Sequence, residues 1–169
     1  MRTVLGTINS ISEWSGRLIS WLVLFLFLVG TYDAIMRFVF NAPTMWAYET
    51  MMMLGGVIYL GGWAYDCLHK SHIRIDLFYT KLPPRKRALL DVVCAMIFFF
   101  PLMAILIKTS TDWAWYAWST HEVMSESFWY PPAGPFRTAI AVGICLFFLQ
   151  GSAQFIRDFY FVVKGKPYD

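Results

Sequence analysis

The stretch that decides the fold runs from Ile35 to Thr50 and reads Ile-Met-Arg-Phe-Val-Phe-Asn-Ala-Pro-Thr-Met-Trp-Ala-Tyr-Glu-Thr. It lies between two long apolar runs, and residues 41–43, Asn-Ala-Pro, predict a tight turn between two helices. Asp33, Arg37 and Glu49 are the only charged residues of the two runs before Asp66. Because a charge is costly in lipid, we expect each of the three to face protein and to have a partner.

Composition points to a membrane protein. The chain has 169 residues, of which 58% are hydrophobic and 15% are charged, whereas soluble domains average about 25% charged residues. Apolar runs near 20 residues are long enough to cross about 30 Å of hydrocarbon. We therefore predict an all-α integral membrane protein with one domain over residues 1–169. Its four transmembrane helices are expected at about residues 18–40, 45–67, 88–107 and 136–156.

The segments around these spans have patterns of their own. Residues 1–17 alternate apolar and polar side chains at helical spacing, which predicts an amphipathic helix at the membrane interface that runs into the first span. Residues 75–82 predict a short amphipathic turn between the second and third helices, and Pro83 and Pro84 end it. The third helix is expected to be long, from about Arg85 to about His121, with a kink at Pro101.

The distribution of Lys and Arg predicts the orientation. Loops on the cytoplasmic side of a membrane carry an excess of these residues. One side has Arg2, Arg17, Lys70, Arg74, Lys81, Arg85, Lys86, Arg87, Arg157, Lys164 and Lys166. The other has Lys108 and Arg137, with Arg37 near that end of the first span. Both termini and the 68–87 loop are therefore predicted to be cytoplasmic. The 41–44 turn and the 108–135 segment are expected on the opposite side.

The three charged residues near the first turn allow two interpretations. Asp33 and Arg37 are four residues apart on one helix and can pair, and Glu49 follows about one turn into the second span. We interpret the three as a structural ion cluster that fixes the first two spans as a hairpin, or as a contact with a partner. The alternative is a protonatable carboxylate that couples transport to protons or sodium, because carboxylates within membranes mark ion paths.

Two further groups of residues predict contacts between helices or proteins. Small residues allow close helix approach in membranes, so the second span is expected to pack through Gly55, Gly56, Gly61 and Gly62. Aromatic residues gather in the 113–130 segment and indicate a membrane interface. The same segment is our candidate for a periplasmic docking surface for an external protein, formed by Trp113, Trp118, Glu122, Glu126, Trp129 and Tyr130.

Several classes of function are disfavoured. No predicted span carries the pair of facing histidines that a membrane cytochrome needs for haem. Neither a metal-ligand pattern, a nucleophile–base pair, a phosphate-binding loop nor a nucleic-acid motif is found. We therefore expect no enzyme activity, no metal or other cofactor, and no nucleic acid as partner.

At this point the sequence resembles a known family. The sequence is similar to the DctQ-like family in several features taken together. These are four spans with both ends inside, the turn at residues 37–41, Trp46 and Glu49, the 72–76 segment with His72, Arg74 and Asp76, and the Leu82-Pro83 stop. This family comprises the small membrane subunits of tripartite ATP-independent periplasmic (TRAP) transporters. The match covers nearly the whole chain, and its specificity lies in the order and spacing of these features together.

The resemblance implies the partners and the role. It implies a large membrane subunit with the substrate and sodium sites, and a periplasmic substrate-binding protein that delivers a substrate, typically an organic acid. The chain would be a small permease subunit in the bacterial inner membrane, surrounded by the lipid bilayer, that scaffolds the large subunit. Two other classes stay open: a small proton-coupled four-helix exporter that acts on its own, and a membrane anchor of a respiratory enzyme.

Overall fold

The computed structural model describes residues 2–69 and 83–165, and within these ranges it is built of helices without strands. The elements are α1 (Arg2–Phe38), α2 (Met45–Leu68), α4 (Pro84–Cys94), the π-helical turn η1 (Ala95–Phe99), α5 (Phe100–Ser119) and α6 (Ala133–Lys164). The predicted cytoplasmic turn before α4, with His72, Arg74 and Asp76, lies outside the described residues.

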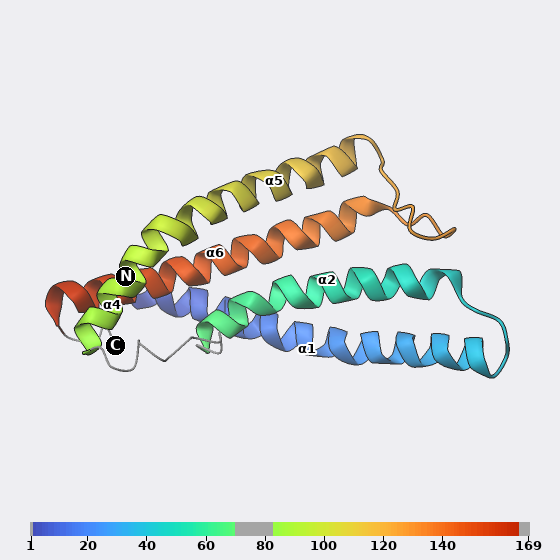
Figure 1. Cartoon of the computed structure of the whole chain (residues 1–169), viewed down its shortest axis with the longest axis horizontal. Helices are drawn as coiled ribbons and strands as arrows, with labels where there is room; N and C mark the ends of the chain where they lie inside the picture. Colours follow the sequence, from blue (N-terminus) through green and yellow to red (C-terminus); the bar gives the residue numbers. More distant parts are fainter. Residues whose placement is uncertain (1, 70–82, 166–169) are drawn as a thin grey trace.

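The helices form two hairpins that meet along one line. Helix α1 packs on α2, α5 packs on α6, and α2 and α6 join the two hairpins. Figure 1 shows the order α5, α6, α2, α1 across the molecule, with α1 beginning and α6 ending at the same end. We call this the terminal end. The α1–α2 turn and the connection between α5 and α6 lie at the opposite end, which we call the loop end.

Among the described residues, three helices are long and apolar enough to cross a membrane: Leu5–Phe38, Pro84–Ser119 and Ala133–Lys164. Helix α2 does not reach the same hydropathy, because it contains four glycines, Glu49 and several Trp and Tyr residues. With 24 residues it is nevertheless about 36 Å long at 1.5 Å per residue. The helix is present where the sequence predicts a span, although it is not among the three helices named above.

The predicted long third helix is present as one path through α4, η1 and α5. Pro101 has no backbone N–H and cannot complete the regular ladder of an α-helix. The π-helical turn lies directly before it, at Ala95–Phe99, where the ladder changes from i→i+4 to i→i+5 bonds. The irregularity expected at Pro101 is thus a π-turn within a continuous helix.

The predicted interfacial helix at residues 1–17 is the first part of α1 and not a separate element. Its polar residues contact α6. The fully buried Ser12 donates a hydrogen bond to Gln150 Oε1 at 2.9 Å, and Gln150 Nε2 lies 3.3 Å from Asn9 Oδ1. Arg157 also donates to Asn9, at 3.0 Å. These bonds satisfy polar groups where water is excluded, and they fix α1 against α6.

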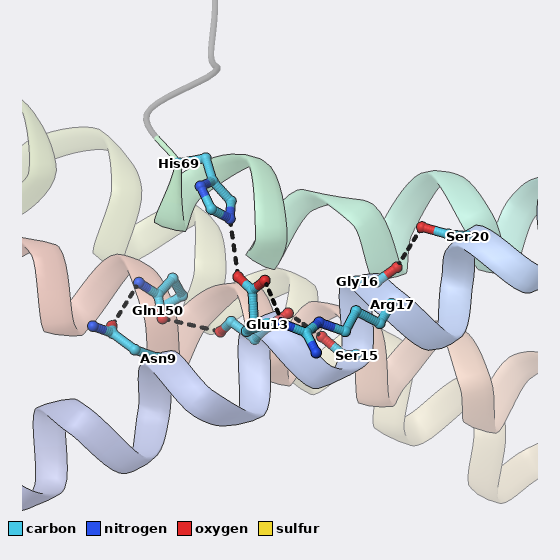
Figure 2. A network of polar contacts seen from close by, with 9 residues as sticks. Asn9, Glu13, Ser15, Gly16, Arg17, Ser20, His69 and Gln150 are labelled. Atoms are coloured by element: carbon cyan, nitrogen blue, oxygen red, sulfur yellow. Dashed lines mark hydrogen bonds and ion pairs between the residues drawn. The ribbon is translucent and has the colours of Figure 1, made fainter.

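The same part of α1 is tied to the end of α2, as Figure 2 shows. Glu13 contacts His69 Nε2 at 3.0 Å and Arg17 at 3.5 Å. Both pairs are exposed, so they contribute little to stability. The buried hydrogen bond of Gln150 therefore holds α1 against α6 more firmly than the exposed Glu13–His69 pair holds α1 against the end of α2.

Of the four glycines predicted to pack, Gly56 and Gly61 lie against neighbouring helices, whereas Gly55 and Gly62 do not. A Cβ atom at Gly61 would lie 2.6 Å from Ile19 on α1, and one at Gly56 would lie 2.9 Å from Phe136 on α6. Gly143 on α6 approaches the backbone of Gly61 so closely that a Cβ atom would lie 3.3 Å from its nitrogen. By contrast, nothing in the described structure lies within 4 Å of a Cβ atom at Gly55 or Gly62.

This difference predicts the effect of filling each position. Gly61→Val should lower the melting temperature of the detergent-solubilised chain, because the new side chain meets Ile19 on α1. Overpacking of this kind costs about 1–3 kcal/mol. Gly62→Val is the matched control and should change stability by less than about 0.5 kcal/mol. Equal destabilisation by the two variants would contradict the packing described here.

Candidate docking site at the α5–α6 loop

The α5–α6 loop, residues 120–132, has a closed shape fixed by its own backbone. Helix α5 ends at Ser119, and His121 and Tyr130 take left-handed φ angles of 50° that turn the chain. Met124 donates to the carbonyl of Pro131 at 2.8 Å, and Ala133 donates to that of Glu122 at 2.9 Å. These bonds bring the two arms of the loop together before α6 begins, so the loop projects from the loop end as one unit (Figure 1).

An ion pair closes the base of the loop. Both terminal nitrogens of Arg137, on α6, donate to the two carboxylate oxygens of Glu122. The guanidinium carbon of Arg137 lies 4.1 Å from the centre of the Trp113 ring on α5. A bidentate pair with a cation over an aromatic face has a defined geometry. It fixes the angle between the loop and both helices.

Trp118 supports the same junction from the end of α5. Its indole nitrogen donates to Thr138 Oγ1 at 2.8 Å, and its ring lies against Gly134, where a Cβ atom would be only 3.0 Å away. Glycine at this position therefore lets α6 begin directly beside the indole. We conclude that Trp113, Trp118 and Glu122, which we predicted as docking residues, have contacts that hold the loop in place.

Glu49 connects the loop to α2. Its side chain is fully buried, and its Oε1 atom accepts a hydrogen bond from the backbone N–H of Ser127, at the tip of the loop. Its Oε2 atom has no hydrogen-bond partner within the described residues. The bond spans 78 positions of sequence. It joins the α1–α2 hairpin to the α5–α6 hairpin at the loop end.

The predicted cluster of Asp33, Arg37 and Glu49 is therefore corrected. Asp33 does pair with Arg37, at 3.0 Å, and it also accepts hydrogen bonds from the side chain and backbone N–H of Thr44. These contacts fix the turn between α1 and α2. Glu49 is not part of the group because its carboxylate points to Ser127, which supplies a backbone donor from a distant part of the chain.

The other predicted docking residues, Glu126, Trp129 and Tyr130, are exposed, as Trp113 and Trp118 also are. Glu126, Trp129 and Tyr130 project from the loop, together with Phe128. Trp129 also lines an apolar groove of about 350 Å³ between the loop, α6 and α2, whose α2 wall includes Met53. A surface that combines exposed aromatic rings with one carboxylate on a fixed loop is suited to binding another protein.

Sequence analysis missed three residues that build this site or its supports. Ser127 acts through its backbone N–H, which leaves no mark in the sequence. Arg137 was counted only for orientation, although a lone cation at the start of an apolar helix implies a nearby carboxylate. Gln150 interrupts the apolar run of the fourth span, and a buried amide also requires a partner. Both signals were available in the sequence.

In the part of the chain that the structure describes, no group of three or more His, Cys, Asp or Glu side chains is placed to hold a metal ion. The site consists of hydrogen bonds, one buried carboxylate and an exposed aromatic surface.

Comparison with protein families gives one result. The family described as "Tripartite ATP-independent periplasmic transporters, DctQ component" matches residues 26–160. This range includes the last part of α1 (residues 26–38), the whole loop end and most of α6. A comparison with curated proteins gives no match.

The bond between Glu49 and Ser127 predicts how the loop responds to substitution. Glu49→Ala should speed hydrogen exchange at the Ser127 amide, because the N–H loses its acceptor. The lost bond is worth about 1–3 kcal/mol, so exchange should rise by about 5- to 160-fold. Glu126→Ala is the control, since that exposed carboxylate lies one residue from Ser127. Unchanged exchange in Glu49→Ala would show that Glu49 does not hold the loop.

Proposed function

Because the chain belongs to the DctQ family, the small component of TRAP transporters, we propose that it is the non-catalytic small permease subunit of a sodium-coupled uptake transporter for organic acids. In this role it scaffolds the large membrane subunit and helps dock the periplasmic binding protein. The family match over residues 26–160 carries this proposal. Proteins of this family work with a large membrane subunit and a binding protein and are not known as enzymes.

The scaffold role is supported by how the helices are arranged. The four long helical paths contact one another mainly as neighbours in a row, so large apolar side chains face outward along α1, α4, η1 and α5. Polar side chains with internal contacts gather at the two ends. An apolar middle with fixed ends can pack against a second membrane protein without changing its own shape.

We further propose that α2 is the fourth transmembrane helix and that the terminal end is cytoplasmic, in the bacterial inner membrane. Alkaline-phosphatase fusions after Thr44 and after Ser125 should then be active, and a fusion after Gly165 should be inactive. The Lys and Arg distribution gives this orientation. Active fusions after Gly165 would reverse it, and fusions after Thr44 and Ser125 with unequal activity would show that the two loops lie on different sides.

The docking role makes a prediction about the exposed part of the α5–α6 loop. Trp129→Ala should weaken binding of the periplasmic protein to the assembled transporter by about tenfold, as exposed tryptophans at interface centres do. The measurement is the Kd by surface-immobilised binding. Trp115→Ala removes an equally large ring from an exposed position on α5 and should leave the Kd unchanged. Equal Kd values for wild type and Trp129→Ala would refute docking through the loop.

The alternative is a small proton-coupled exporter that acts on its own. Such a protein needs a carboxylate in a transport path, whereas Glu49 accepts a hydrogen bond from the loop and Asp33 is paired with Arg37. Reconstitution into vesicles separates the two functions. We expect sodium-dependent uptake of an organic acid only when this chain, the large subunit and the binding protein are all present. Proton-driven transport by this chain alone would establish the exporter instead.

A further inference from the structure

A groove of about 690 Å³ lies between α1 and α2, in the half of α2 nearer the terminal end. Its α1 wall runs from Gly16 to Val23, and its α2 wall runs from Ile58 to Asp66. From its length, its position and its charges we propose that the groove binds one molecule of phosphatidylethanolamine from the leaflet at the terminal end. This inference goes beyond the proposed function and rests on it only in that α1 and α2 both span the membrane.

Gly62 keeps the groove open. It lines the groove, and nothing in the described structure lies within 4 Å of a Cβ atom placed there. The neighbouring glycines are in contact instead: a Cβ atom at Gly61 would lie 2.6 Å from Ile19, and one at Gly16 would lie 2.2 Å from Tyr65. The two helices therefore touch at Gly16 and Gly61, and an open space remains beside Gly62.

The length of the groove is that of one leaflet. Residues 58–66 of α2 extend over about 12 Å, and half of the hydrocarbon core is about 15 Å thick. A helix about 10 Å wide would fill roughly 940 Å³ over this length, which is more than the groove holds. A partner helix that crosses the membrane would also require a contact of about 30 Å. The size of the groove therefore fits an acyl chain and not a transmembrane helix.

The charged groups lie where the two apolar runs meet the polar segments. Arg17 directly precedes the first run, and Asp66 lies near the end of the second. They are at a similar height, because Tyr65 packs against Gly16; Figure 2 shows Gly16 and Arg17 on the part of α1 that lies beside α2. From Asp66 back to Ile58, α2 carries no other charge. The groove is thus charged at the membrane boundary and uncharged within the membrane, as a phospholipid is.

The two charges select the headgroup. A carboxylate binds an ammonium group, and a guanidinium binds a phosphate. Asp66 lines the groove, and none of the ion pairs seen among the described residues includes it. Arg17 pairs only with Glu13, at 3.5 Å, and its side chain is 75% exposed. Phosphatidylethanolamine presents both an ammonium and a phosphate to these groups, whereas phosphatidylglycerol has no cation for Asp66.

Native mass spectrometry of the full chain tests the inference. The purified chain is stripped of lipid and titrated with phosphatidylethanolamine or with phosphatidylglycerol that has the same acyl chains. We expect one phosphatidylethanolamine to bind per chain, about tenfold more tightly than phosphatidylglycerol, which is the effect of one hydrogen bond to a charged group. Asp66→Asn should reduce this preference to about twofold and leave the binding of phosphatidylglycerol unchanged.

Filling the groove tests the place of binding. Gly62→Leu should weaken binding of phosphatidylethanolamine by about tenfold, the equivalent of roughly two methylene groups that the acyl chain no longer buries. Gly55→Leu is the matched control, because it adds the same side chain to α2 at a position that is also open but does not line the groove. Ser20→Leu fills the groove from α1 and should act like Gly62→Leu, so the test does not depend on one variant.

Each outcome supports the inference or overturns it. Equal binding of phosphatidylethanolamine by wild type, Gly62→Leu and Ser20→Leu would show an adventitious lipid only. An unchanged lipid preference in Asp66→Asn would also overturn the inference. If the complex with the large subunit no longer binds the lipid, that subunit covers the groove, and the inference fails while the proposed function stands. If the lipid binds as expected but the large subunit does not purify with the chain, the proposed function fails and the inference stands.

Discussion

The close approach of α2 and α6 at Gly61 and Gly143 is the contact on which the rest of the structure depends. It is where the α1–α2 hairpin meets the α5–α6 hairpin. Because Gly143 has no side chain, α6 lies close against the backbone of Leu60 and Gly61 on α2. Polar groups join the two hairpins on either side of this contact. Ser12 and Gln150 form one such joint at the terminal end, and Glu49 with the backbone of Ser127 forms the other.

These two joints have different consequences. The terminal joint holds α1 against α6. The joint at the loop end holds the α5–α6 loop over α2, so that its exposed aromatic residues occupy a fixed position beyond the helices. A subunit that contacts one partner within the membrane and another outside it needs both the helix packing and the position of the α5–α6 loop to be fixed. This shared requirement links the packing of the chain to the role proposed for it.

Much of the fold could be predicted from the sequence, because a membrane helix requires a long run of apolar residues. The first, third and fourth helices and the tight turn after Phe38 are found where the apolar runs and Pro43 placed them. The pairing of Asp33 with Arg37 followed from their spacing alone. The π-turn before Pro101 could not be specified, since a proline predicts an irregularity without its form.

The candidate site was harder to predict because its contacts join distant segments. The position of Glu49, about one turn into the second span, predicted a contact with Arg37, but its partner is a backbone N–H of the α5–α6 loop. Sequence alone gives no register between separate hairpins. For the same reason, the sequence could not predict that Gly61 packs against a neighbouring helix and Gly62 does not.

The central claim is that this chain is one component of a larger membrane complex. Native mass spectrometry of the tagged chain, expressed with its large subunit and purified in mild detergent, tests it most directly. The account predicts a complex with the large subunit in a fixed ratio. A chain that appears only by itself, while the large subunit is present in the same membranes, would contradict it.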